Sequence, residues 1–278
     1  MRRRIVIRYT RATHPYAANA PTLSSRVKTA SDIRPLTTRE ELLACVALQY
    51  RTWGDSFTDV VPPSILQISQ RLGGVAAGAF DERGALIGFV YGMTGVQNGL
   101  IVHWSDMLAV VPEAQGQGIG RRLKEYQRAA VAKVGATVIY WTYDPLVARN
   151  AHLNFNVFGV RVAEYVENMY GESQSPVHRG IGTDRFIVAW PVDDGELDAR
   201  RDEIARATRA AKSADGGSVR RVEIPTSIDT LQASDMNAAR EWRRTTRAAL
   251  AGALASGYAV NGFQIDDKAA RAYYVLTR

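Results

Sequence analysis

The segment AVVPEAQGQGIGRRL, residues 109–123, joins an apolar run to a cationic helix through a proline and three glycines on alternate positions. The glycines are Gly116, Gly118 and Gly120. Backbone N–H groups at a helix start have no partner within the helix and bind anions, and glycines let a ligand approach them closely. The segment therefore predicts a cradle for a phosphate group.

Two better-known phosphate loops do not fit this segment. A P-loop needs a glycine followed four residues later by Gly-Lys-Ser/Thr, and no such string occurs here. A dinucleotide fingerprint reads G-x-G-x-x-G, but Arg121 stands in place of the last glycine. The acidic residue expected about 20 positions on is also missing, because Tyr140 and Trp141 stand there. Nucleotide hydrolysis and NAD binding are therefore disfavoured.

The surrounding sequence alternates between helical and extended patterns. Apolar spacing and capping residues predict helices and strands along most of the chain beyond residue 31. The expected helices are 37–50, 63–72, 118–134 and 147–158, and the expected strands lie in the hairpin 73–93, which turns at 81–84, and in 103–111, 136–144, 161–169 and 184–190. Further along, a solvated helix within 193–218, a helix near 237–255 and strands at 257–263 and 271–277 are expected.

The loop resembles the acyl-CoA loop of the GNAT N-acyltransferase superfamily, on the pattern Gln115-x-x-Gly118-x-Gly120 behind a strand that ends before Pro112. The resemblance covers roughly residues 31–193. It implies an α+β fold, an α/β/α sandwich around a mixed, mostly antiparallel sheet that is splayed at its central strands. It also implies that the loop wraps the CoA pyrophosphate while the preceding strand offers backbone groups to the pantetheine arm. The cofactor-binding residues implied are Leu108, Ala109, Val110, Gln115, Gly116, Gln117, Gly118, Ile119, Gly120, Arg121 and Asn150.

A second family feature lies in residues 148–160, where Asn150, Ala151 and Gly159 match the helix that faces the cofactor. Phe155 departs from the family, because it stands where a tyrosine usually protonates the CoA thiolate. The wider phrase WTYDPLVARNAHLNFNVFG also resembles a less characterised branch with a C-terminal extension, some members of which N-acylate amino acids, including by succinyl transfer.

Amine acyl transfer needs a polarised carbonyl, a deprotonated amine and a proton for the leaving thiolate. By the family's geometry the backbone N–H near Leu108 is the oxyanion donor. The two-residue strand period puts Trp104, Asp106, Leu108 and Val110 on one face, so Asp106 is expected to act as a general base or to hold an ammonium group, with Trp104 beside the substrate. A buried structural ion pair is the alternative role of Asp106.

Three further residues are candidates for the site. Tyr143 could replace the missing acid, and Asp144 ends its strand at the mouth where such sheets collect ligands. Arg185 suits a bidentate contact with an acceptor carboxylate. Their alternative roles are a packed strand aromatic for Tyr143, a helix cap or turn for Asp144 and an ion pair for Arg185.

The composition of the chain limits the classes of molecule that it is expected to bind. The chain has 278 residues, 46% of them hydrophobic, and a formal net charge of +7, which suits an anionic cofactor. The four histidines and the single Cys45 show no metal-ligand spacing, so no metal is expected. No apolar run reaches the ~20 residues of a membrane helix. We therefore expect a cytoplasmic protein that binds acyl-CoA and a small amine, not membrane or nucleic acid, with a homodimer as an open alternative.

The domain prediction has three parts: a flexible extension over 1–30, a GNAT-like catalytic domain over 31–193, and a C-terminal helix-and-strand subdomain over 194–278. The function predicted is transfer of an acetyl or succinyl group from CoA to a primary amine, by direct attack in a ternary complex. A CoA-binding regulatory module without turnover is the alternative that Phe155 keeps open.

Overall fold

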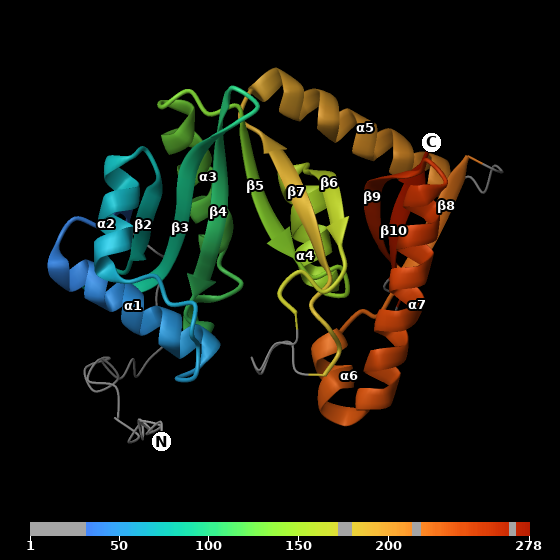
Figure 1. Ribbon diagram of the computed structural model, residues 1–278, viewed down its shortest axis with the longest axis horizontal. Helices are drawn as coiled ribbons and strands as arrows, with labels where there is room; N and C mark the ends of the chain where they lie inside the picture. Colours follow the sequence, from blue (N-terminus) through green and yellow to red (C-terminus); the bar gives the residue numbers. More distant parts are fainter. Residues whose placement is uncertain (1–31, 172–179, 213–217, 267–270) are drawn as a thin grey trace, which may run out of the picture.

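The computed structural model describes residues 32–171, 180–212, 218–266 and 271–278, and within them two β-sheets organise the chain (Figure 1). The larger sheet has the strand order β1-β2-β3-β4-β5-β7-β6. Its strands are β1 (Asp32–Pro35), β2 (Val75–Phe80), β3 (Leu86–Gln97), β4 (Leu100–Val110), β5 (Val138–Tyr143), β6 (Arg161–Val166) and β7 (Arg185–Pro191). All neighbouring pairs are antiparallel except β4 and β5, so the expected mixed, mostly antiparallel sheet is confirmed.

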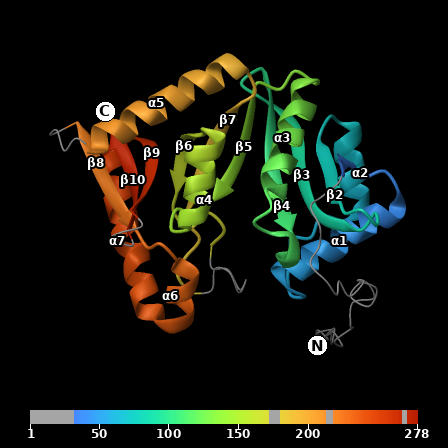
Figure 2. The ribbon, with the colours of Figure 1, turned by 180° about the vertical axis from the view of Figure 1, so that it is seen from behind.

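Helices cover both faces of this sheet. Helices α1 (Arg39–Trp53) and α2 (Pro63–Arg71) lie on one face, and α3 (Ile119–Ala132) and α4 (Ala148–His152) lie on the other (Figures 1 and 2). Both α3 and α4 connect strands that run in the same direction, and such crossovers share one hand, which puts both helices on one face. The expected α/β/α sandwich is therefore present.

The sheet opens between β4 and β5. Pairing between them covers only Val102 to Trp104 on β4 and Val138 to Tyr140 on β5. Beyond these three pairs the two strands diverge, as Figure 1 shows, while β4 stays paired with β3 to Val110. The expected splay at the central strands is thus observed, and it leaves the β5-facing main chain of β4 without a neighbouring strand.

Residues 194–212 carry the chain away from the large sheet as helix α5 (Asp194–Lys212), and a second sheet of order β8-β10-β9 follows. Its elements are β8 (Val219–Ile224), α6 (Ile228–Ser234), α7 (Met236–Ala255), β9 (Ala259–Asp266) and β10 (Arg271–Thr277). The C-terminal helix-and-strand extension is therefore present. Helix α6 and strand β1 are short elements that the sequence patterns did not predict.

One hydrophobic core joins the two parts. The buried ring of Tyr274 on β10 contacts Phe155 and Phe186 of the large-sheet layer and Phe263 of β9. Across the same junction the buried guanidinium of Arg200 donates to the carbonyls of Val160 and Val260. The C-terminal extension thus completes the core of the large sheet.

The helix that follows Val147 ends differently from a regular α-helix. After His152 the chain continues as a π-helical segment, η3 (Leu153–Phe158), and stops at Gly159, whose φ of 72° is in the left-handed region. The expected extension over 1–30 lies outside the described residues. Among the described helices, none combines the length and apolar character needed to cross a lipid bilayer.

Helix α1 begins at a reciprocal cap. The hydroxyl of Thr38 accepts from the N–H of Glu41, and the Glu41 carboxylate accepts from the N–H groups of Thr37 and Thr38. Arg34 of β1 donates to the same carboxylate at 2.6 Å. The Arg34 hydrogen bond is the main cause of a lowered pKa, about 2, at Glu41, and it opposes the effect of burial.

Replacing Glu41 by Gln should lower the free energy of unfolding at pH 7 by about 1 kcal/mol, the usual value of a helix cap. The folded-state pKa lies below the ordinary 4.5, so this stabilisation is present above pH 4.5 and is lost as the pH falls towards 2. Urea unfolding of the wild type and the Glu41→Gln variant between pH 7 and pH 2 measures this difference in the free energy of unfolding. A difference that stays constant over that range would contradict the assignment.

Candidate functional site

The glycine loop turns the chain from β4 into α3. Val111 leads into a short 3₁₀ turn, η2 (Pro112–Ala114), and the next glycines, Gly116 and Gly118, have φ of 76° and 74°. Only glycine adopts this region readily, and a Cβ at either position would meet nothing within 4 Å. Two glycines therefore shape the loop, and the space over them is open.

Gly118 is also the N-cap of α3, and no side chain caps this helix. The first N–H groups of a helix have no partner within it, so those of Ile119, Gly120 and Arg121 carry the partial positive charge of the helix start. A Cβ on Gly120 would make only ordinary contacts, at 3.8 and 3.9 Å, with the side chains of Leu108 and Val110. Packing within the described residues thus does not require glycine at 120.

Two side chains of the loop have partners of their own. The Gln115 amide donates to the carbonyl of Val110 at 3.0 Å and ties the loop to the end of β4. Arg121 forms an exposed ion pair with Glu125 at 2.7 Å. Both residues lie at the loop, as expected, and Gln115 has a clear structural role in holding its shape.

Strand β4 contains a bulge that changes which residues share a face. Consecutive residues Tyr91 and Gly92 of β3 pair with Met107 and Ser105, so Asp106 is the extra residue. Before the bulge, Ser105 faces α3, where it accepts a hydrogen bond from Lys124. A β-bulge places two residues opposite one and breaks the two-residue alternation of the strand.

After the bulge, Leu108 and Val110 are the residues that face the start of α3. The expectation that Trp104, Asp106, Leu108 and Val110 share one face is therefore wrong. Trp104 and Asp106 lie towards α1 and α2, on the opposite side of the sheet from the side chains of Leu108 and Val110.

The Asp106 carboxylate lies on the side of the sheet that holds the loop between α1 and α2. Partial burial raises its pKa, a hydrogen bond from Trp104 lowers it, and the nearby Asp59 raises it. The residue remains exposed to solvent. A carboxylate with a raised pKa beside a second carboxylate is suited to binding an ammonium group or taking a proton from it.

Tyr143 points away from this surface. Its side chain is buried on the α4 side, and its hydroxyl lies 3.2 Å from that of Tyr274, which donates to the carbonyl of Pro145. Burial raises the pKa of the Tyr143 hydroxyl far above its usual value. The structure thus gives Tyr143 its alternative role as a packed strand aromatic and argues against its expected role as an acid.

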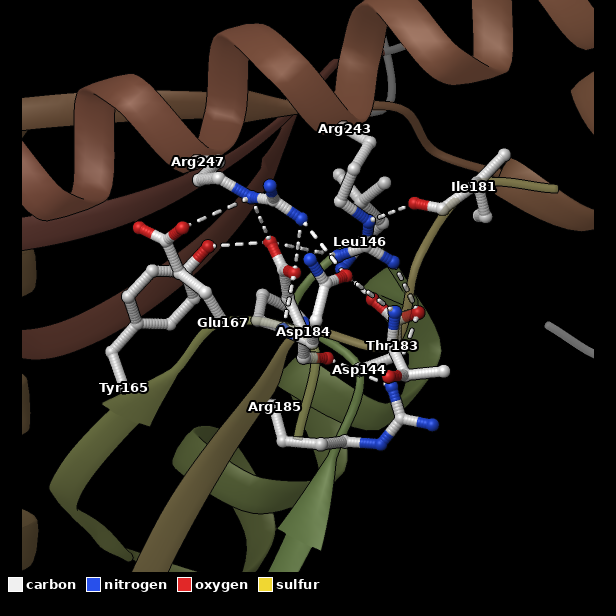
Figure 3. Close-up of polar contacts among 12 residues, drawn as sticks. Asp144, Leu146, Tyr165, Glu167, Ile181, Thr183, Asp184, Arg185, Arg243 and Arg247 are labelled. Atoms are coloured by element: carbon white, nitrogen blue, oxygen red, sulfur yellow. Dashed lines mark hydrogen bonds and ion pairs between the residues drawn. The ribbon is translucent and has the colours of Figure 1, made fainter. Parts of the chain in front are cut away.

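Asp144 is a member of a buried ionic cluster at the end of β5 (Figure 3). One carboxylate oxygen accepts from the N–H of Leu146 at 2.8 Å, which is the turn contact named above as its alternative role. The other accepts from Arg243 of α7 and lies 3.7 Å from Arg185. Asp144 is therefore fully engaged by the protein, and catalysis by it is not supported.

Arg185, expected to bind an acceptor carboxylate, is 4% exposed. Its guanidinium donates to the carbonyl of Asp184 and lies 5.2 Å from the ring centre of Tyr170. Burial lowers its pKa and the charge of Asp144 raises it. Arg185 thus has the ion-pair role given as its alternative.

Asp184 forms the second half of the cluster, and its acidity is set by its donors. Arg247 donates to both carboxylate oxygens, Tyr165 donates at 2.7 Å, and the N–H of Asn168 donates at 3.1 Å. Burial alone would raise the pKa of Asp184, but these hydrogen bonds outweigh it and hold the pKa below its usual value. Figure 3 shows α7 above both carboxylates.

The sequence patterns missed the arginines of α7 and Lys124 of α3. Arg243 and Arg247 are four residues apart, so they share a helix face, but nothing local indicates that carboxylates 99 and 63 residues away bind them. Lys124 is 3% exposed although lysine is seldom buried. Its helical spacing from Gly120 and Gln127 was the one available signal that it faces the sheet.

Comparison with known proteins shows which protein family part of this chain is similar to. Residues 42–154 match the model of the acetyltransferase (GNAT) family. No curated protein matches the sequence. Solved structures with a similar arrangement include the NatC complex bound to Gag peptide and CoA, at 15% identity and a TM-score of 0.46, with 58% of this chain and 97% of that one covered.

Two further structures are similar to the same extent. The ribosomal-protein-S18-alanine N-acetyltransferase from Escherichia coli is 19% identical, with a TM-score of 0.44 and coverage of 58% and 94%. An aminoglycoside 6'-N-acetyltransferase complexed with coenzyme A is 16% identical, with a TM-score of 0.43 and coverage of 58% and 97%. The family match covers residues 42–154, less than half of the chain, and over that segment the chain is similar to GNAT acetyltransferases, in agreement with the resemblance drawn from the glycine loop.

Replacing Arg243 by Met should lower the free energy of unfolding by about 3–5 kcal/mol, because the buried Asp144 would keep only the more distant Arg185 as a cationic partner. Arg244→Met on the next position of α7 is the matched control, since Arg244 pairs with Glu241 at the exposed surface and should change stability little. Urea unfolding of the wild type and of each variant measures the two changes in the free energy of unfolding. Equal losses would show that the cluster does not support the fold.

Proposed function

We propose that this protein is an acyl-CoA-dependent N-acyltransferase that moves an acetyl or succinyl group to a primary amine of a small molecule such as an amino acid. The observation that carries the proposal is the open glycine loop at the uncapped start of α3, next to the stretch of β4 that β5 leaves unpaired. Together they offer an anion cradle and an unpaired strand edge side by side.

In this proposal the loop from Gln115 to Arg121 holds the CoA diphosphate. Main-chain N–H groups and the helix dipole supply the attraction, and the open space over Gly116 and Gly118 admits the phosphates. The unpaired edge of β4 at Leu108, Ala109 and Val110 then receives the amide groups of the pantetheine arm. We assign Asn150, at the start of α4, a contact with the cofactor from the β5 side of the opening.

The amine approaches from the α1 and α2 side, where Asp106 lies. Asp106 and Asp59 attract the ammonium form, and Asp106 takes its proton before attack. The N–H near Leu108 stabilises the oxyanion that forms on the thioester carbonyl, which collapses to the amide and releases the CoA thiolate. Trp104 donates to Asp106 and fixes its orientation.

A proton for the thiolate needs a group other than Phe155, which is buried and has no acidic proton. We assign this role to Tyr170. Its hydroxyl lies 3.0 Å from that of Thr142, in the part of β5 that has left β4, and the side chain is 55% exposed. In this proposal the bound acceptor shares this surface with Tyr170.

The decisive experiment incubates the protein with acetyl-CoA or succinyl-CoA and a panel of amino acids and small amines, and measures free thiol and the acylated product. Product with one donor and one amine supports the proposal and identifies both substrates. Binding of acyl-CoA in calorimetry without thiol release across the panel favours the regulatory module instead. The cytoplasmic location and the homodimer stay predictions, for fractionation and light scattering to test.

Gly118→Ala should weaken CoA binding at least tenfold, because the added methyl group strains the loop and narrows its approach. Gly84→Ala is the control: Gly84 has φ of 77°, equally open surroundings and a place in a turn far along the chain. Each substitution strains the backbone by roughly 1–2 kcal/mol. Calorimetric titration with CoA measures the affinity of each variant, and similar affinities would show that the loop does not bind CoA.

Asp106→Asn should lower kcat by about 10²–10⁴-fold with acyl-CoA binding unchanged. In the wild type the rate should fall as the pH drops through the raised pKa of Asp106, because the protonated carboxyl cannot accept the amine proton. The variant should lose this acidic limb of the pH profile. A variant with the same profile and rate would assign the base elsewhere.

A further inference from the structure

Lys124 of α3 is buried without an acidic partner. Its ammonium donates to the hydroxyl of Ser105 at 2.9 Å and to the amide oxygen of Gln127 at 3.3 Å, and it lies 3.6 Å from the ring centre of Trp141. No carboxylate of the described residues lies within ion-pair distance of it. Burial accordingly lowers the pKa of Lys124 well below its usual value.

The partners of Lys124 lie at the point where β4 and β5 separate. Trp104 on β4 and Tyr140 on β5 form the last pair between the two strands. Ser105 and Trp141 are the next residue on each strand, and Lys124 touches both. The lysine therefore spans the first place where β4 and β5 are no longer joined by backbone hydrogen bonds.

The contacts of Lys124 continue into a polar network under β4. Gln127 lies 3.0 Å from one ring nitrogen of His103, and Thr94 of β3 lies 3.0 Å from the other. Burial lowers the pKa of His103 to about 4, with a smaller contribution from the charge of Lys124, so the ring is neutral at pH 7. The network links α3, β3 and β4 around one buried amine.

An apolar side chain of similar length would cost less to bury here. Desolvation of an ammonium is offset only by good geometry and by partners for its protons, and replacing a buried charge with an apolar group often stabilises a protein. The hydroxyl, the amide and the indole ring supply such partners without cancelling the charge. A task other than stability explains a lysine at this position.

We propose that Lys124 is a positioning residue that sets the opening between β4 and β5. This inference rests on the proposed function, which places the pantetheine arm in that opening. By holding Ser105, Lys124 also fixes the main chain directly before the Asp106 bulge, and so the direction of the N–H groups that follow it. Lys124 itself touches neither substrate nor the reacting atoms.

The test compares Lys124→Met, Lys124→Gln and Lys124→Arg with the full-length wild type. The Met variant should unfold at the same or a higher temperature, bind acyl-CoA at least tenfold more weakly, and raise KM for the donor more than it lowers kcat. Amide hydrogen exchange in 105–108 and 141–143 should become faster. The Arg variant, which keeps a cation, should recover part of the affinity.

Val131→Ala is the control on the same helix, because Val131 is fully buried in the core but lies away from the opening. It should lower the unfolding temperature and leave the affinity for acyl-CoA within twofold. If the Met variant does not fold, the Gln variant carries the same comparison.

Wild-type affinity and exchange in the Met or Gln variant would overturn the role of Lys124. Absence of acyl-CoA binding by the wild type would instead refute the proposed function, and hydrogen exchange would still report on the opening.

Discussion

The separation of β4 from β5 is the constraint on which the site depends. Sheet strands tend to pair along their whole length, since unpaired N–H and C=O groups are costly once buried. Here pairing stops after three residues of each strand, and the bulge at Asp106 begins directly beyond. The opening is therefore the place where backbone groups stay available, and α3, with its glycine loop, lies beside it.

The C-terminal extension stabilises the part of the large sheet around β5 and β7. Arg243 and Arg247 of α7 neutralise Asp144 and Asp184, which lie where β5 ends and β7 begins. Without α7, Asp144 would keep only the more distant Arg185 as a cation and Asp184 would lose its pairing with Arg247. The extension thus acts as a structural part of the large sheet, through charge at one end and through the ring of Tyr274 in the core.

Sequence reasoning reached the fold class, the glycine loop and most elements because these depend on local chemistry: positive φ at Gly116 and Gly118, and regular apolar spacing. It failed where the local rule was broken or the partner was distant. Strict alternation on β4 could not anticipate the extra residue Asp106. Asp144 and Arg185 looked free for a substrate because they are distant from each other along the chain, and Arg243, the closer partner of Asp144, lies in another part of it.

The shared core also has a consequence for how the chain folds during synthesis. The hydroxyls of Tyr143 and Tyr274 meet across 131 residues of sequence, and the ring of Phe155 packs against that of Tyr274 on β10. Contacts between such distant residues form slowly and late. A nascent polypeptide on the ribosome therefore holds an incomplete core around the large sheet, with apolar side chains exposed, until the strand that carries Tyr274 has been translated.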